Sequence, residues 1–176
     1  MTWLIRLGGT LLAVALLATP LSAVTLDEAV PQWVKWTGCK ARVVTSYDHH
    51  GVESFYSPNS HTLYIGLART PERHLLMIVL HESGHCLQMQ KGYLVPLYNA
   101  GGNRAIELDA DRIATDLACG LNLDGPQLLR DLFEWALATY GYEGDADHGT
   151  LDERVAQAKN SLTCRIMQAP KESPIR

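Results

Sequence analysis

The segment His81-Glu82-Ser83-Gly84-His85 constrains the fold of this chain more than any other part of its sequence. Residues four apart lie above one another on one face of an α-helix, so a helix here places both imidazoles side by side. Two imidazoles at that spacing can bind one metal ion, with the intervening Glu82 pointing at the open coordination position. We therefore expect a helix with His81 and His85 as metal ligands and Glu82 as a base. The alternative is an ordinary solvated cluster.

The residues before this motif predict that its helix is buried. Thr70-Pro71-Glu72-Arg73 combines a capping hydroxyl, a proline in the first turn and an early acid, which is typical of a helix start. The stretch from Leu75 to Leu80 is then apolar nearly all round. A helix of that kind is expected to be surrounded by protein.

The rest of the chain predicts an α+β domain, in which a short antiparallel sheet packs on the HExxH helix with about three further helices. Alternating apolar residues predict strands over 42–47 and 61–67, separated by turns. A short amphipathic segment opens the chain at 26–37, and 92–103 is a Gly-rich loop with Pro96. The further helices are predicted over 104–119, 127–140 and 151–164.

The first residues resemble a targeting segment. Arg6 gives a short positive region, an apolar run covers 11–18, and Thr19 to Ala23 supplies a helix break and small residues for cleavage. We expect a signal peptide over 1–23, one domain over 24–170 and a flexible tail over 171–176. The apolar run is short for a bilayer span, which disfavours the alternative of a retained anchor. The mature protein is then exported, periplasmic or secreted, with no stable membrane insertion.

The charge balance of the chain is acidic. Its 15 Lys and Arg face 19 Asp and Glu, for a formal net charge of −4, which becomes one unit more negative without Arg6. Such a balance argues against nucleic acid or an anionic membrane surface as a partner.

Four cysteines in an exported chain predict two disulfides. A helix rises about 1.5 Å per residue, so Cys119 lies about 18 Å beyond Glu107, whereas Cys86 adjoins a predicted ligand. A bond between Cys86 and Cys119 is therefore disfavoured if the two helices meet at a metal ion. The pairing stays open, with Cys39–Cys86 and Cys119–Cys164 favoured.

A third metal ligand is predicted in the helix over 104–119. Glu107 and Asp111 are four residues apart and share a face, so one can bind a metal while the other hydrogen-bonds a ligating imidazole. We expect Glu107 to be the ligand. Asp109, on another face, is the weaker candidate, and a solvated acidic patch beside Arg112 is the alternative.

These residues carry a family resemblance. The pair His81-Glu82-Ser83-Gly84-His85 and Glu107-Leu108-Asp109-Ala110-Asp111 resembles the gluzincin metallopeptidases, which combine HExxH with ExxAD. HtpX-type and CAAX-prenyl endopeptidases and the small minigluzincins are of this kind. The segment from Asp147 to Val155 is similar to the family's late His-Pro…Arg element, with Gly149 in place of Pro. The resemblance covers Thr62 to Arg154. The second motif also resembles the cytosolic ImmA/IrrE-type proteases, which the signal peptide disfavours.

The resemblance implies a zincin-like fold and one zinc ion bound by His81, His85 and Glu107. It also implies hydrolysis of a peptide or protein substrate, with Glu82 as the base that assists attack by a zinc-bound water. Asp111 would orient a ligating imidazole, and His148 and Arg154 would lie near the substrate.

Several alternatives stay open. His148, Tyr140 or Tyr142 can stabilise the oxyanion. A zinc-binding, non-catalytic or regulatory interaction protein with a degenerate peptidase fold is the alternative function, and hydrolysis of another amide is a further one.

Overall fold

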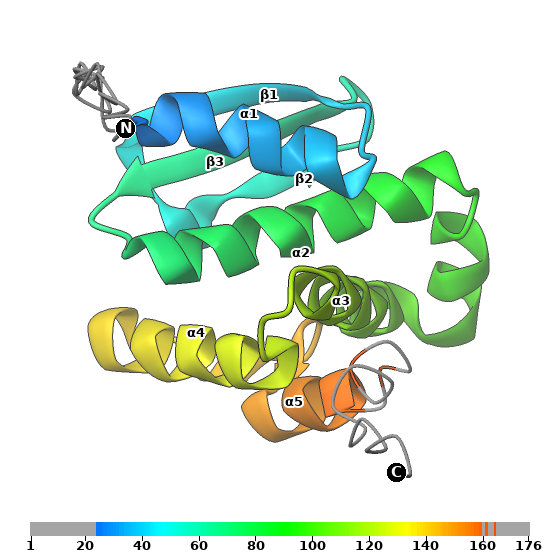
Figure 1. Cartoon of the computed structure of the whole chain (residues 1–176). Coiled ribbons are helices and arrows are strands. Elements are labelled where there is room, and N and C mark those ends of the chain that lie inside the picture. The colour runs from blue at the N-terminus through cyan, green and yellow to red at the C-terminus, as the bar shows by residue number, and fades with distance from the viewer. Residues whose placement is uncertain (1–23, 160, 162–163, 165–176) are drawn as a thin grey trace, which may run out of the picture.

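Helix α2 (Glu72–Gln90) carries the HExxH segment and lies between the two halves of the fold (Figure 1). The computed structural model describes residues 24–159, 161 and 164. A sheet and α1 lie on one side of α2, and three helices lie on the other. The helices are α1 (Leu26–Thr37), α3 (Leu94–Gly120), α4 (Gly125–Tyr140) and α5 (Leu151–Lys159). The predicted α+β class is confirmed.

The domain boundaries predicted from sequence fall only partly within the described residues. The predicted signal peptide (1–23) and tail (171–176) lie outside them, as do positions 165–170. Within the described part, no helix is long and apolar enough to cross a membrane.

Helix α2 is buried because both of its sides face apolar residues. Leu75 and Val79 pack with α1 and the sheet in one apolar cluster. Met77, Ile78 and Leu80 belong to a second cluster with residues of α3 and α4. Burying one such side chain stabilises the fold by about 1.5–3 kcal/mol. This arrangement confirms the buried helix predicted from its sequence and fixes the motif between two packed layers.

The sheet is mixed, so the prediction of an antiparallel sheet is wrong in part. Its strands β1 (Arg42–His50), β2 (Phe55–Ser57) and β3 (Thr62–Ala68) lie in the order β1-β3-β2. β2 is antiparallel to β3, but β1 runs parallel to it. The reason is that the chain does not reverse directly from β1 into β3. A 3-10 turn, η1 (Gly51–Glu53), and the short β2 first carry it back to the end of the sheet at which β1 begins.

Two connecting segments, one of them predicted as a loop, contain regular structure. The loop over 92–103 is helical from Leu94, with a kink at Gly101 and Gly102, where Gly102 has a φ of 65°. Pro96 is tolerated because it lies in the first turn of the helix, where a backbone N–H has no intrahelical partner. The segment before α5 forms a short hairpin of β4 (Gly144–Asp145) and β5 (Gly149–Thr150).

Two disulfides confirm the favoured pairing. Cys39 is bonded to Cys86, which ties the start of the sheet to α2. Cys119 is bonded to Cys164, which ties the end of α3 to the C-terminal part of the chain. Disulfides of this kind suggest an oxidising, exported environment.

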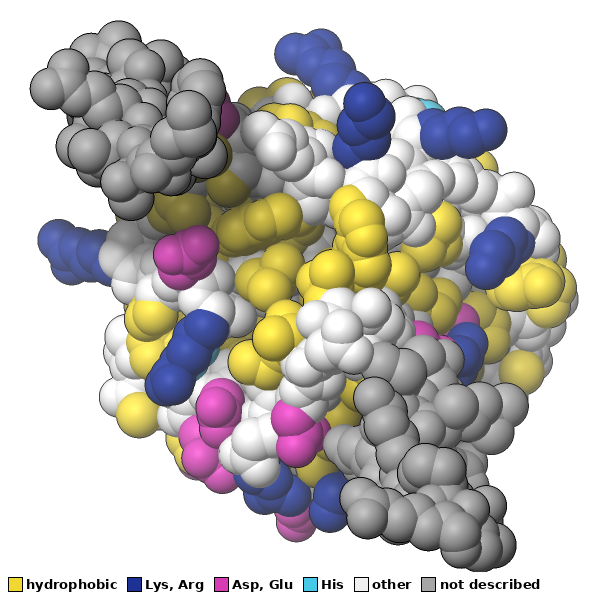
Figure 2. Space-filling view, in the orientation of Figure 1, with side chains coloured by type: hydrophobic (Ala, Val, Ile, Leu, Met, Phe, Trp, Pro, Cys, Tyr) yellow, Lys and Arg dark blue, Asp and Glu magenta, His cyan; other side chains and the backbone are white. Residues whose placement is uncertain are grey.

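On the face of the molecule shown in Figure 2, charged side chains of both signs are interspersed around the edge, and apolar side chains gather across the middle. Among the residues coloured there, the positive charges do not form one continuous patch.

Helices α2 and α3 are in tight backbone contact at Gly84. A Cβ atom at this position would lie 3.0 Å from the carbonyl oxygen of Ala110 and 3.1 Å from its Cα. The backbones therefore come together where Gly84 has no side chain. Ala110 lies one turn after Glu107 on α3, so this contact sets how near Glu107 comes to the histidines of α2.

We expect Gly84→Ala to destabilise the fold and to weaken metal binding, because the added methyl group pushes α3 away from α2. Overpacking of this kind costs about 1–3 kcal/mol, against a gain of up to about 1 kcal/mol in helix propensity. Gly120→Ala is the matched control, since its Cβ would meet only a Trp36 atom at 3.9 Å. Urea unfolding measures the stability of both variants. Equal stability would contradict the close contact of α2 and α3 at Gly84.

Candidate metal centre

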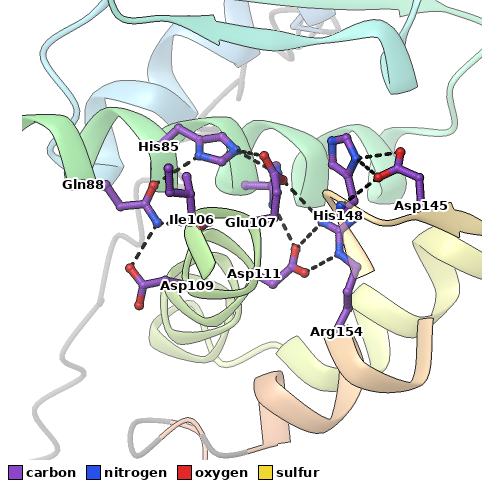
Figure 3. A network of polar contacts seen from close by, with 10 residues as sticks. His85, Gln88, Ile106, Glu107, Asp109, Asp111, Asp145, His148 and Arg154 are labelled. Carbon is purple, nitrogen blue, oxygen red and sulfur yellow. Dashed lines mark hydrogen bonds and ion pairs between the residues drawn. The ribbon is translucent and has the colours of Figure 1, made fainter. Parts of the chain in front are cut away.

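Three side chains from two helices converge on one point. His81 and His85 of α2 and Glu107 of α3 each offer one atom, and these atoms lie within 4.8 Å of one another. The two Nε2 atoms are 3.1 Å apart. Glu107 Oε2 lies 3.1 Å from His81 Nε2, and Oε1 lies 3.4 Å from His85 Nε2. The three residues predicted as ligands therefore form a possible metal-binding cluster (Figure 3).

Both imidazoles are held so that Nε2 faces the cluster. Nδ1 of His81 donates to Asp111 Oδ1 at 2.9 Å. Nδ1 of His85 donates to Gln88 Oε1 at 3.2 Å. A proton on Nδ1 leaves a lone pair on Nε2, which is the state that a metal ligand needs. Asp111 thus contacts a candidate ligand as predicted.

Gln88 was not predicted from sequence, although it is central to this arrangement. It is fully buried, and its amide nitrogen donates to the carbonyl of Ile106 at 2.8 Å and to Asp109 Oδ2 at 3.1 Å. These bonds orient the amide so that its oxygen faces His85. The available signal was its position, three residues after His85 on the same helix face.

Asp109, the weaker ligand candidate, does not face the histidines. Its carboxylate accepts hydrogen bonds from Gln88 and from Arg112, the latter at 2.6 Å and 2.9 Å. Arg112 also contacts Asp116 on the same helix. The three acidic residues of this segment therefore have different surroundings. Glu107 and Asp111 face the cluster, whereas Asp109 pairs with Arg112.

Behind the cluster lies a buried ion pair between Asp111 of α3 and Arg154 of α5. Arg154 donates through Nε to Oδ2 at 2.5 Å and through Nη2 to Oδ1 at 2.8 Å. Both side chains are almost completely excluded from solvent. Burial alone would raise the pKa of Asp111, but the charge of Arg154 and the hydrogen bond from His81 outweigh it and lower that pKa.

The electrostatics of the cluster favour positive charge. Burial alone would lower the pKa of His81, but its hydrogen bonds to Asp111 and Glu107 outweigh this and raise it to about 10. Burial would likewise raise the pKa of Glu107, but both imidazoles outweigh it and hold that pKa below its usual range. A site that attracts a proton so strongly also favours a cation bound at the same atoms.

Glu82 is buried beside the cluster without being part of it. Its side chain lines a pocket of about 410 Å³ together with the three candidate ligands. Burial raises the pKa of Glu82, while the neighbouring imidazoles and a backbone hydrogen bond from Tyr56 act in the opposite direction.

The pocket has an apolar wall that the sequence did not predict. Leu132, Phe133 and Ala136 of α4 line it together with Ile78 of α2. All four are buried. In sequence they look like the ordinary core-facing positions of an amphipathic helix, so nothing in the pattern distinguishes them from core residues.

His148 lies at the rim of the same pocket, at the tip of the β4–β5 hairpin. Its Nδ1 lies 2.8 Å from both carboxylate oxygens of Asp145, which also accepts the backbone N–H of His148. Figure 3 shows this pair on the far side of Glu107 from His85. Tyr142 also lines the pocket, and its ring is 6.4 Å from that of His148. Tyr140 packs against Trp135 and His50 instead.

Comparison with known protein families, curated proteins and solved structures returned no match. The function of this site therefore has to be inferred from its geometry and from the motifs themselves.

We expect Glu107→Ala to lower metal affinity by more than about 100-fold, because losing a ligand costs more than losing an outer hydrogen-bond partner. Asp109→Ala, two residues away on the same helix, should lower it by less, because Asp109 contacts the imidazole of His85 only through Gln88. Elemental analysis after dialysis, followed by metal titration, compares the two variants with the parent chain. A variant at position 109 that loses the metal while the variant at 107 keeps it would reverse the assignment.

We expect Arg154→Met to lower the free energy of unfolding by about 3–5 kcal/mol, since it leaves the buried Asp111 carboxylate without its partner. Arg130→Met is the control. Arg130 lies 3.8 Å from Glu134 in an exposed pair, and such pairs contribute about 0–1 kcal/mol. Urea denaturation measures the free energy of unfolding of both variants. Similar decreases would show that the buried pair contributes no more to stability than the exposed pair.

Proposed function

We propose that this protein is an exported zinc metallopeptidase that hydrolyses peptide bonds. The convergence of His81, His85 and Glu107 supports this most directly. Zinc binds imidazole and carboxylate at about 2.0–2.2 Å, and a tetrahedron of that size has edges of about 3.3–3.6 Å. The two Nε2 atoms are 3.1 Å apart, and each of them has a Glu107 oxygen within 3.4 Å, which is short enough for one ion to bind all three side chains.

Three protein ligands leave one coordination position open, as in catalytic rather than structural zinc sites. The three candidate ligands line the same pocket as Glu82 and His148, so a bound ion would be within reach of a substrate there. When bound, zinc would polarise the scissile carbonyl and make a water molecule more acidic. Glu82 would accept the proton of the attacking water and return it to the leaving amine.

His148 is suited to stabilise the oxyanion that develops on the carbonyl. The Asp145 carboxylate accepts a hydrogen bond from its Nδ1, so Nε2 would donate to the oxyanion only when the ring is protonated on both nitrogens. A donor of this kind can contribute about 3 kcal/mol to the transition state. Tyr142, which also lines the pocket, is the alternative donor.

A polypeptide substrate fits the pocket because an edge strand forms part of its wall. Phe55 and Tyr56 of β2 line it, and β2 is the edge of the sheet, paired on one side with β3. An extended peptide can add to such an edge through main-chain hydrogen bonds. The two disulfides support an exported location, where thiols are oxidised.

A non-catalytic zinc-binding protein is the second candidate. The burial of Glu82 argues against it. A binding site needs no carboxyl group at this position, and burying one has a cost in stability unless it serves a function.

We expect Glu82→Gln to keep zinc and the fold but to lower hydrolysis of a heat-denatured protein by about 10²–10⁴-fold, since the amide cannot accept the proton. Glu134→Gln, exposed on α4, is the control and should match the parent. Removal of zinc by a chelator should abolish activity, and adding zinc back should restore it. Full activity in the Glu82 variant would refute the assigned base, and a metal-replete parent that cleaves no substrate would refute the peptidase.

A further inference from the structure

Gln88 lies between two of the candidate ligands and connects their helices. Its amide oxygen accepts the Nδ1 proton of His85 at 3.2 Å, and its amide nitrogen donates to the carbonyl of Ile106 at 2.8 Å. That carbonyl belongs to the same peptide unit as the backbone nitrogen of Glu107. One side chain of α2 therefore links the ring of one ligand to the backbone of another (Figure 3).

The two acceptors on α3 leave the Gln88 amide only one orientation. Its nitrogen faces the Ile106 carbonyl and the Asp109 carboxylate, and both of these groups accept hydrogen bonds without donating them. A flipped amide would bring its oxygen against both acceptors. Because Gln88 is fully buried, water does not compensate for such a repulsion. The amide oxygen is therefore the atom that faces His85.

This orientation decides which nitrogen of the His85 ring carries the proton. An amide oxygen only accepts, so the proton is on Nδ1 and the lone pair that a metal binds is on Nε2. The same Nε2 lies 3.4 Å from Glu107 Oε1. The contacts thus form a closed loop, which runs from the His85 ring through Gln88 to the backbone at Glu107 and returns through its carboxylate. A displacement of Gln88 would change both the tautomer of His85 and its distance from Glu107.

The two histidines differ in what supports their hydrogen-bond acceptors. Nδ1 of His81 donates to the Asp111 carboxylate, which Arg154 of α5 also binds. Nδ1 of His85 donates to a neutral amide. Among the described residues, the hydrogen-bond partners of Gln88 all belong to α2 and α3. The placement of His85 therefore depends on the contact between these two helices, without support from α5.

We infer that Gln88 is a positioning residue for the metal, which fixes the tautomer of His85 and the distance of its ring from Glu107. The inference rests on the zinc site of the proposed function and adds a residue beyond its ligands and its base. Gln88 acts through His85 and is not itself a ligand. Loss of an outer hydrogen-bond partner of this kind typically lowers metal affinity by about 10–100-fold.

Two substitutions at position 88 separate positioning from a general structural role. Gln88→Met has a similar volume but no acceptor for His85, so we expect zinc affinity to fall by about 10–100-fold. Gln88→Glu keeps the acceptor but places a second carboxylate beside Asp109 and gives up the hydrogen bond to Ile106. We expect it to bind zinc about tenfold more tightly than Gln88→Met, because a carboxylate again accepts the Nδ1 proton. For a merely structural role, Glu would be at least as harmful as Met.

Gln90→Met is the matched control. Gln90 lies two residues later on α2, and its side chain also reaches another segment, where it accepts from the backbone nitrogen of Lys40 at 2.6 Å and donates to the carbonyl of Gly38 at 3.2 Å. Two residues turn a helix by about 200°, so Gln90 faces away from Gln88. Its substitution should lower stability without changing zinc affinity.

Zinc affinity of the parent and the three variants is measured by competition with a chromophoric chelator. The visible absorption spectrum of bound Co²⁺ reports the coordination geometry in the same proteins. We expect the parent and Gln90→Met to share one cobalt spectrum and Gln88→Met to give a different one.

The outcomes separate this inference from the proposed function. Equal zinc affinity or an identical cobalt spectrum in the parent and Gln88→Met would overturn the positioning role and leave the peptidase intact. Gln90→Met losing as much affinity as Gln88→Met, or Gln88→Glu binding no more tightly than Gln88→Met, would also overturn it. A parent that binds zinc in a Gln88-dependent way but cleaves no denatured protein would refute the peptidase and support the positioning role.

Discussion

The close contact between α2 and α3 at Gly84 is the constraint on which the site depends. Gly84 lies inside the HExxH segment, and the backbone of Ala110 occupies the space that a larger side chain would need. Because the helices touch there, Glu107, one turn before Ala110, reaches the Nε2 atoms of His81 and His85.

The packing of α3 against α2 buries charged side chains. A chain of hydrogen bonds and ion pairs between them compensates for the loss of solvent. His81 donates to Asp111, and Asp111 accepts two further hydrogen bonds from Arg154 of α5. Arg154 in turn lies over the ring of Phe133 on α4. Every helix on this side of α2 therefore contributes to holding the cluster, so stability of the C-terminal helices and metal binding are expected to be coupled. The apolar side of that network also forms the wall of the pocket.

Much of the fold and most of the cluster were predictable from local patterns. The burial of α2 followed from its apolar stretch, Glu107 from its spacing to Asp111, and the disulfide pairing partly from helix geometry. The parallel pairing of β1 with β3 was not predictable, because strand direction depends on the path of the connecting segment and not on alternation within either strand. Gln88 and Asp145 were missed because an isolated Gln or Asp carries no pattern until its partners are in place.

The sequence by itself determined which side chains share a helix face, because the helical repeat fixes positions four residues apart whatever surrounds them. For that reason spacing alone was enough to pair His81 with His85 and Glu107 with Asp111. The tertiary structure alone decided which face of α3 meets α2, which carboxylate reaches the imidazoles, and that α4 closes the pocket with apolar residues. These depend on packing between segments distant in the chain, which no local repeat encodes.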